Sequence, residues 1–395
     1  MRPFIYPNNK KFWRVLALME SLGDFIGSMA FNGLTLGNIV MIIIAIVLLY
    51  YAIAKHAEPL LLIPIAFGMI LANIPPEYTG LFSEPTANQP GGLLWYIQRG
   101  LFIGIYPPLI FLGIGALTDF SFLISNPLTI FLGGGAQVGI LIAFLTSHYL
   151  GFDLKAAASI GIIGGADGPT SIYVATKFAP QLLGIIAVAA YSYISLIPVI
   201  QPPIMKLLTT KNERKIRMSK PREVSKTEKL FFSLIVILII GFFIPKALPL
   251  VGMLMFGNFL RECGVAKRLV EASSRYILDS VTILLSLSVG STARADVFLT
   301  PAGLKVILLG IIAFASATAS GILLAKFFNL FLKKKINPLI GASGVSAVPD
   351  SARVAQKVAQ EEDSGNFILM HAMGPNVAGV IGSAIVAGVF LSMIK

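Results

Sequence analysis

Four uncharged, apolar runs constrain the fold of this chain most tightly. They cover residues 37–54, 178–205, 306–325 and 366–394, and none contains Asp, Glu, Lys or Arg. A helix needs roughly 20 apolar residues to cross a bilayer, so each run is about long enough to do so. Charged residues make up 13% of the 395 residues, against about 25% in soluble domains. The sequence therefore predicts an all-α polytopic membrane protein rather than a soluble domain with a large core.

Two glycine-rich stretches interrupt the apolar pattern, and they resemble each other. Residues 161–177 read GIIGGADGPTSIYVATK, and residues 341–357 read GASGVSAVPDSARVAQK. When Pro169 is laid on Pro349, a shift of 349 − 169 = 180, glycines, a serine, a valine, an alanine and a lysine recur at matching positions. Glycine and proline interrupt helices, and at membrane depth such breaks are tolerated only where they line a cavity. A matched pair of breaks in two halves of a transporter indicates its binding site.

Charge predicts how the two halves are oriented. Residues 206–229 hold nine Lys or Arg, which the positive-inside rule places in the cytoplasm. One following span, at residues 230–244, then puts the second half in the opposite orientation to the first. We therefore expect two inverted-topology repeats whose broken helices, or re-entrant hairpins, meet near the membrane centre. The predicted parts are an amphipathic N-terminal segment (1–36), a first transmembrane helix (37–57), repeat 1 (58–205), a basic cytoplasmic linker (206–229), a connecting transmembrane helix (230–245) and repeat 2 (246–395).

Within the first repeat, the apolar pattern predicts one span at residues 95–117, broken at Pro107 and Pro108, and another at residues 128–150. The first break then opens outward and the second toward the cytoplasm. Counting spans back from the cytoplasmic linker places the N-terminus outside the cell, whereas its four basic residues favour the cytoplasm. The sequence therefore does not decide on which side of the membrane the N-terminus lies.

Composition excludes several other classes of site. A single cysteine, Cys263, excludes an intramolecular disulfide and a cysteine zinc cluster. The three histidines, His56, His148 and His371, lie far apart and show no metal-ligand spacing. The net charge of +12 gathers in loops beside the apolar runs, as in other membrane proteins, and no motif indicates nucleic-acid binding.

Asp167, in the first broken stretch, is the leading candidate for ion binding. A charged carboxylate at the centre of a membrane costs roughly 2.5–3.5 kcal/mol, and such residues mark ion or proton paths. Together with Thr170 or Ser171 and unwound carbonyls, it offers the oxygen ligands that sodium prefers. The alternative is a turn aspartate at the mouth of a loop that bonds to its own backbone.

Other polar side chains near the breaks have two interpretations each. Tyr193 is either a functional phenol that needs a partner at depth or an interfacial tyrosine. Arg353 is a clamp for a carboxylate, a snorkelling arginine or the ion-pair partner of Asp350. The second break offers neutral donors and acceptors, which otherwise serve helix packing: Asn337, Ser343, Ser346 and Ser351.

Four longer strings resemble the β subunit of the biotin-dependent sodium-pumping decarboxylases. They read GGADGPTSI (164–172), YSYISLIPVIQPP (191–203), NPLIGASGVSAVP (337–349) and HAMGPNVAGVIGS (371–383). The resemblance extends from residue 34 to the end of the chain. This family includes the oxaloacetate, methylmalonyl-CoA and glutaconyl-CoA enzymes.

The resemblance implies a function. In the family, a soluble α subunit transfers a carboxyl group to biotin, and the β subunit releases CO2 from carboxybiotin, consumes a proton and exports sodium. It implies a biotin-carrying carboxyltransferase α subunit, a small single-span γ or δ subunit, and an oligomeric complex in a bacterial or archaeal cytoplasmic membrane. In the family, the α subunit determines which carboxylic acid is decarboxylated. The competing hypothesis is a secondary sodium-coupled carboxylate transporter without chemistry.

The resemblance also assigns roles to residues of this chain. Sodium ion and partner-borne carboxybiotin are the implied cofactors. The implied catalytic residues are Asp167, Tyr193 and Arg353; the implied substrate-binding residues are Arg353, Asn337 and Ser346; and the implied sodium ligands are Asp167, Asn337, Gly341 and Ser346.

Overall fold

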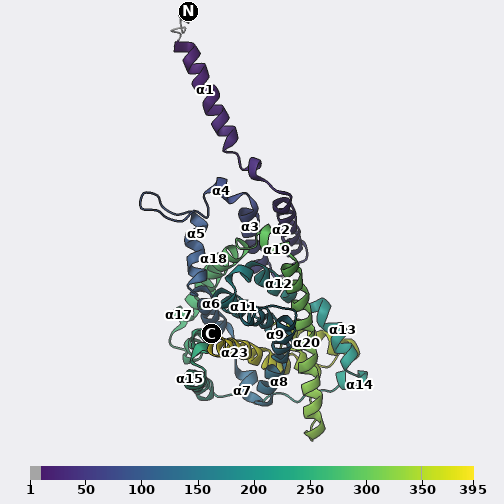
Figure 1. Ribbon diagram of the computed structural model, residues 1–395. Coiled ribbons are helices and arrows are strands. Elements are labelled where there is room, and N and C mark those ends of the chain that lie inside the picture. Colours follow the sequence, from purple (N-terminus) through teal and green to yellow (C-terminus); the bar gives the residue numbers. More distant parts are fainter. Residues whose placement is uncertain (1–9, 348) are drawn as a thin grey trace, which may run out of the picture.

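The computed structural model describes residues 10–347 and 349–395, and every regular element in this part is a helix (Figure 1). Four helical stretches are long and apolar enough to cross a membrane: α2 (Leu36–Ala54), α8 with α9 (Leu128–Tyr149), α20 (Pro301–Phe331) and α23 (Leu369–Met393). Two bent pairs raise the number to six if each pair counts as one span. The prediction of an all-α polytopic membrane protein is confirmed in this part of the chain.

The remaining helices are shorter or less apolar. They are α1 (Lys10–Gly27), α3 (Pro59–Asn73), α4 (Pro76–Thr79), α5 (Leu93–Phe102), α6 (Tyr106–Leu117), α7 (Ser121–Ser125), α10 (Leu154–Gly161), α11 (Gly168–Phe178), α12 (Leu183–Ser195), α13 (Ile197–Leu208), α14 (Lys211–Arg214), α15 (Lys226–Phe243), α16 (Leu248–Cys263), α17 (Lys267–Glu271), α18 (Leu278–Gly290), α19 (Ala295–Phe298), α21 (Leu339–Ala342) and α22 (Asp350–Glu362). Short 3-10 turns cover Ala30–Gly33, Ile162–Gly165, Pro180–Leu182 and Pro245–Ala247, and a π-helical segment covers Ala272–Ile277. The amphipathic α1 stands away from the bundle (Figure 1).

Proline determines where the bent pairs begin their second helix. Helices α5 and α6 meet at 67° across residues 103–105, where Gly104 has a left-handed backbone with φ 84°. Pro107 and Pro108 lie in the first turn of α6, where a missing N–H leaves no helical hydrogen bond unmade. The predicted span is therefore broken, as expected, but the bend precedes these prolines instead of lying at them. In the same way, α12 and α13 meet at 64° around Leu196, before Pro198.

Glycines bring α6 and α16 into backbone contact. A Cβ added at Gly115 on α6 would lie 1.9 Å from the carbonyl oxygen of Leu254 on α16. A Cβ added at Gly257 on α16 would lie 2.0 Å from the carbonyl oxygen of Leu112 on α6. Each helix thus places a glycine against the backbone of the other, and only small residues allow this separation.

A second helix pair, α3 and α18, repeats this arrangement. A Cβ at Gly68 on α3 would lie 2.4 Å from the carbonyl oxygen of Leu287, and one at Gly290 on α18 would lie 1.9 Å from that of Ile65. Each of the two pairs joins a helix of the first half to a helix of the second half. The halves are therefore interlocked rather than placed side by side.

Gly115→Ala should destabilise the protein, because the added methyl group would force α6 and α16 apart. Overpacking of this kind costs about 1–3 kcal/mol. Gly134→Ala, on α8, is the matched control, because nothing lies within 4 Å of its added Cβ and alanine favours a helix over glycine. Thermal unfolding in detergent measures both. Equal unfolding temperatures for the two variants would show that the glycine contact is unimportant.

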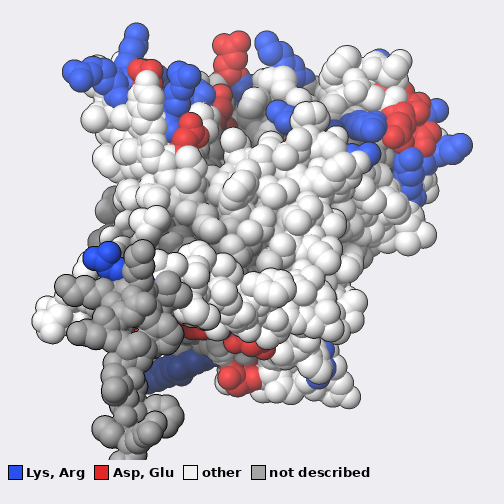
Figure 2. All heavy atoms as spheres, turned by 90° about the horizontal axis from the view of Figure 1, so that it is seen from above, with Lys and Arg blue, Asp and Glu red and all other residues white. Residues whose placement is uncertain are grey.

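Charge on the surface is consistent with a membrane position. Seen from above, most Lys, Arg, Asp and Glu side chains gather toward opposite edges, with a wide uncharged surface between them (Figure 2). The linker is held to the second half by an ion pair between Arg214 and Glu362, with Nη2 and Oε1 2.5 Å apart, and by another between Arg217 and Asp363 at 2.8 Å. Arg214 holds the pKa of Glu362 below its ordinary value through this hydrogen-bonded contact.

Candidate ion and substrate site

The two broken stretches are in direct contact. The backbone N–H of Ser346, in the second break, donates to the carbonyl of Gly165 in the first break at 3.1 Å, and the Ser346 hydroxyl donates to the same carbonyl. Gly165 ends a 3-10 turn, and Ala166 then adopts a left-handed backbone with φ 51°. This conformation turns the chain so that Asp167 becomes the N-cap of α11.

Asp167 is buried and is bound by hydroxyl groups. Its Oδ2 accepts hydrogen bonds of 2.6 Å from Thr170 and 2.6 Å from Ser383, and only 5% of the residue is exposed. Among the described residues, the groups that act on this carboxyl include no cation. A buried charge without a partner is costly, so this position favours a bound cation or a bound proton. The turn interpretation is partly correct as well, because Oδ1 caps α11 through the N–H of Thr170 at 3.4 Å.

A cavity of about 560 Å³ leads to Asp167. None of the described residues that line it is Lys or Arg. Five of them carry carboxyl groups: Glu58, Asp119, Asp167, Asp279 and Asp350. Asp119 lies 3.6 Å from Lys229 in an ion pair, at the end of the basic linker. The cavity therefore reaches from the linker region to Asp167, and its walls attract cations.

Asp119 is a carboxylate at neutral pH. Partial burial acts to raise its pKa, but hydrogen bonds from Ser121 and the cations Lys229 and Arg261 hold that pKa below its usual value. The end of the cavity beside the linker thus holds an ionised carboxylate that is paired with Lys229 and Arg261.

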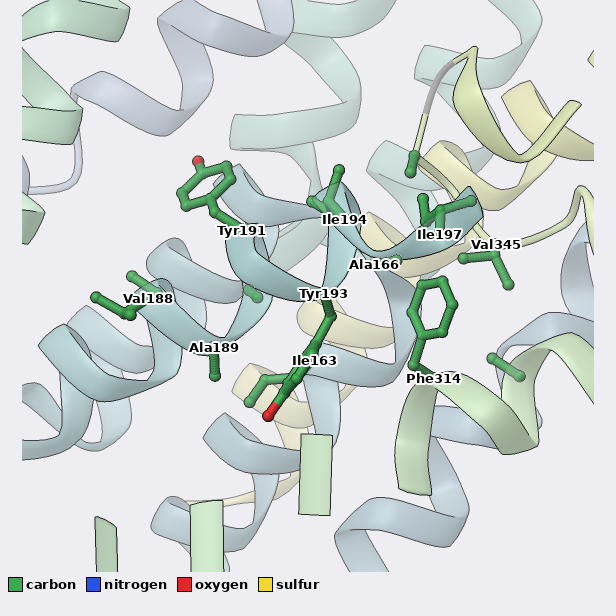
Figure 3. Packing of buried hydrophobic residues seen from close by; sticks show 14 of the residues in the cluster. Ile163, Ala166, Val188, Ala189, Tyr191, Tyr193, Ile194, Ile197, Phe314 and Val345 are labelled. Carbon is green, nitrogen blue, oxygen red and sulfur yellow. The ribbon is translucent and has the colours of Figure 1, made fainter. Parts of the chain in front are cut away.

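The two tyrosines of α12 contact different parts of the protein. Tyr193 donates its hydroxyl hydrogen bond to the carbonyl of Ile307 on α20, and its ring packs against Gly310. Tyr191 points the opposite way (Figure 3), packs against Gly168 and lines the cavity beside Asp167. The Tyr191 hydroxyl is buried and has no hydrogen-bond partner among the described residues. Of the two, Tyr191 is the one that faces Asp167.

Arg353 lies on α22, one turn beyond Asp350. Its Nη1 is 3.6 Å from Oδ1 of Asp350, and 67% of its side chain is exposed. The ion pair with Asp350, which was one of the predicted interpretations, is therefore present. Because Asp350 lines the cavity, the exposed guanidinium lies close to the rim of that cavity.

Asn337 and Gly341 occupy structural positions just before and within the second break. The Asn337 amide donates to the carbonyls of Arg214 at 2.8 Å and Ile216 at 3.0 Å, which fixes the linker. A Cβ at Gly341 would lie 2.0 Å from the carbonyl oxygen of Gly321 on α20, so this glycine permits close packing. Neither is among the described residues that line the cavity.

Three polar groups in and near the site were missed by sequence reasoning: Ser383, Tyr191 and Asn376. The Asn376 amide donates to the carbonyls of Ser343 and Val345 at 3.0 Å each, but its buried oxygen has no partner in the part of the chain that the structure describes. Such an oxygen beside a broken helix is available to a cation. Ser383 and Asn376 both lie in the string at residues 371–383, which was the only signal that could have identified them.

Comparison with known proteins agrees with this geometry. The family model of the Na+-transporting oxaloacetate decarboxylase beta subunit matches residues 37–394. The methylmalonyl-CoA decarboxylase subunit beta of Propionigenium modestum is 52% identical over 95% of this chain and 100% of its own length. The glutaconyl-CoA decarboxylase subunit beta of Acidaminococcus fermentans is 50% identical, with 96% and 99% covered. The oxaloacetate decarboxylase beta chain of Haemophilus ducreyi is 46% identical, with 95% and 99% covered.

These relatives match over essentially their whole length, and the matched region contains both breaks, the cavity and Asp167. The chain therefore belongs to the Na+-transporting oxaloacetate decarboxylase beta subunit family and is the membrane β subunit of a sodium-pumping, biotin-dependent decarboxylase.

Proposed function

We propose that the chain releases CO2 from carboxybiotin delivered by a partner subunit, consumes a proton, and uses this reaction to export sodium. The observation that carries the proposal is Asp167, a buried carboxyl that hydroxyl groups hold and no described cation neutralises. Either sodium or a proton must neutralise it. Because one carboxyl holds only one of them at a time, the consumption of a proton can be tied to the release of sodium.

The proposed sodium site lies where the two breaks meet. Asp167 and Ser346 supply side-chain oxygens, and the Asn376 oxygen, which has no partner among the described residues, is a further candidate. Asn337 and Gly341 complete the implied set. In the present conformation Asn337 binds the linker, so direct ligation would require its oxygen to leave the N–H of Leu339, to which it is bonded at 3.1 Å.

The proposed substrate group is Arg353, whose exposed guanidinium would bind the carboxylate of carboxybiotin. Arginine suits this role because its planar fork matches a carboxylate. Tyr193 is proposed to act in the same cycle, but its hydroxyl would first have to leave the carbonyl of Ile307. In this conformation it holds α12 to α20.

Partners and location follow from the same proposal. The relatives are named as β subunits or β chains, so this chain works in a multi-subunit complex. We infer a biotin-carrying carboxyltransferase α subunit and a small single-span γ or δ subunit. The bacterial relatives support a place in a bacterial cytoplasmic membrane.

We also propose that the two halves are inverted repeats. The support is the reciprocal glycine contact of α6 with α16 and of α3 with α18. In each pair, a glycine of the first half packs against the backbone of the second half, and a glycine of the second half packs against the backbone of the first. The cavity beside the basic linker then corresponds to a conformation that faces the cytoplasm. Alternating access between such halves would carry sodium across the membrane.

Ser383→Ala and Ser346→Ala should raise the sodium concentration for half-maximal decarboxylation. The first removes a hydrogen bond to a charged group, worth about 1.5–3 kcal/mol, which corresponds to roughly tenfold or more. Ser392→Ala is the matched control, since Ser392 lies on the same helix and, within the described part of the chain, its hydroxyl bonds to the carbonyl of Gly388 alone, at 2.8 Å. The measurement is CO2 release by the complex against sodium concentration. An unchanged sodium dependence in both variants would limit these serines to packing.

The function itself is tested with the complex reconstituted in inside-out vesicles. CO2 release should accompany sodium uptake and should require the biotinylated partner. Carboxylate uptake with sodium, without that partner and without CO2, would instead support a secondary transporter.

A further inference from the structure

A second cavity lies beside the basic linker. Its volume is about 280 Å³, close to the lower end of the range for small-ligand sites, which begins at about 300 Å³. The described residues that line it come from the linker (218–222), the end of α7, the loop after α20 (334–336) and the first turn of α23. Helices α7, α14 and α15 and the end of α20 lie at the same, lower end of the bundle (Figure 1). Both halves of the chain therefore meet the linker at this cavity.

This cavity is separate from the one that reaches Asp167. The two have no described lining residue in common. On α7, Phe122 lines the cavity of Asp167 and Ser125 lines the second cavity; on α23, Met373 lines the first and His371 the second. Helix α7 and the first turn of α23 thus separate the two cavities. A group bound in the second cavity is not held by the residues proposed above for sodium or carboxybiotin.

The lining of the second cavity is positively charged. None of the described residues that line it is Asp or Glu, and four are basic: Lys220, Arg222, Lys334 and Lys335. Glu228 balances Arg222, with Oε1 and Nη2 2.7 Å apart. The three lysines form no ion pair within the described part of the chain. Lys334 donates instead to the neutral hydroxyl of Ser219 at 2.9 Å. The cavity therefore holds positive charge that an anion would balance.

Neutral hydrogen-bonding groups accompany the lysines. The hydroxyls of Ser125 and Ser219 and the amide of Asn126 line the same cavity. A phosphate group carries several acceptor oxygens and forms short, strong hydrogen bonds with charged donors. Ammonium, hydroxyl and amide groups around one small cavity, without a carboxylate among the described lining, suit such a group.

The surface of α20 next to this cavity is apolar. Helix α20 ends at Phe331, three residues before Lys334. Near this end the exposed fractions are 52% for Phe327, 74% for Leu330 and 73% for Phe331. On a helix long and apolar enough to cross a membrane, such side chains face acyl chains, and lysines just beyond them reach the headgroup level. The cavity therefore opens where phospholipid headgroups lie.

We propose that this cavity binds the phosphate group of an anionic phospholipid of the cytoplasmic leaflet. Lys334 and Lys335 bind the phosphate, and the acyl chains lie along the end of α20. Basic pockets at the cytoplasmic ends of transmembrane helices bind anionic headgroups in this way. The bound lipid fastens the linker to α7 and to the loop after α20. This inference goes beyond the function proposed above and does not depend on it.

Binding of a fluorescent phosphatidylglycerol to the delipidated complex in detergent tests the site. Lys334→Gln combined with Lys335→Gln should weaken binding about 25-fold, because each basic residue at a headgroup contributes about fivefold. Lys334→Arg combined with Lys335→Arg keeps both charges and should bind within about twofold of the wild type. A loss in the arginine variant as large as in the glutamine variant would overturn the role of charge.

Lys211→Gln combined with Lys333→Gln is the matched control. It also removes two exposed lysines, one of them next to Lys334, but neither is among the described residues that line the cavity. Binding should stay within about twofold of the wild type. Equal weakening in the control and in the glutamine variant would overturn the site in favour of a general attraction between lipid and a basic surface.

Competition experiments identify the source of the phosphate. Unlabelled phosphatidylglycerol should displace the fluorescent lipid at least about tenfold more effectively than phosphatidylcholine, whose choline would face the lysines. Inorganic phosphate at the same concentration should not displace it, because phosphate gains nothing from the apolar end of α20. Equal displacement by phosphatidylcholine or by phosphate would overturn the proposal. Unchanged lipid binding by the glutamine variant, together with loss of the partner subunit, would assign the cavity to an acidic surface of that partner instead.

Discussion

Asp167→Asn should abolish decarboxylation and sodium export together, each by at least about a hundredfold. Asparagine is nearly the same size, caps helices as well as aspartate and keeps an oxygen for sodium. It cannot carry the charge that alternates between sodium and a proton. Burial favours the protonated carboxyl, and bound sodium favours the carboxylate, so the two compete at one group.

The measurement is CO2 release and sodium uptake by inside-out vesicles at several pH values. Asp153→Asn is the control, because Asp153 caps α10 by accepting from the N–H of Ala156 at 2.6 Å, just as Asp167 caps α11. Full CO2 release without sodium uptake would make Asp167 a transport ligand only. Full retention of both activities would reduce it to a capping residue.

Arg353→Lys should reduce decarboxylation of free carboxybiotin by roughly 10- to 100-fold. Lysine keeps the charge but loses the planar fork that binds both oxygens of a carboxylate, and a hydrogen bond to a charged group is worth about 1.5–3 kcal/mol. Most of the loss should be in KM, because the carboxylate is held by this contact before CO2 leaves.

Lys357→Arg provides the control, since Lys357 lies one turn further along α22 and is also exposed. Its kinetics should be unchanged. If Arg353→Lys decarboxylated carboxybiotin at the wild-type KM and kcat, Arg353 would be only the ion-pair partner of Asp350.

Local patterns in the sequence were sufficient to predict the helical membrane fold and the two breaks. Uncharged runs specify spans by length alone. Gly164, Gly165 and Pro169 mark the first break because glycine disfavours a helix and proline is tolerated only in its first turn. Asp167 was identifiable because a carboxylate within an apolar region is costly enough to need a reason.

The bends were harder to place, because proline has two roles. Pro107 and Pro108 suggested a break at their own position, but the first turn of a helix tolerates proline, so the bend lies before them at Gly104. The run 178–205 has no charge or glycine cluster near Leu196, and its 64° bend again lies just before a proline, Pro198, in the first turn of α13.

The partners of Asp167 could not be predicted from spacing. Ser383 lies 216 residues further along the chain, and only the folded structure brings the two together. Which of Tyr191 and Tyr193 faces Asp167 could not be predicted from spacing either. Residues two apart on a helix point to nearly opposite sides, and hydropathy alone does not say which side carries the cavity.

The hydrogen bonds from Ser346 to Gly165 have a mechanical consequence. They join the second broken stretch to the 3-10 turn of the first, so a movement of either stretch away from the other must break them. If a bound ion is exposed alternately to the two sides of the membrane, either the two stretches move together against the surrounding helices, or both hydrogen bonds open in each cycle.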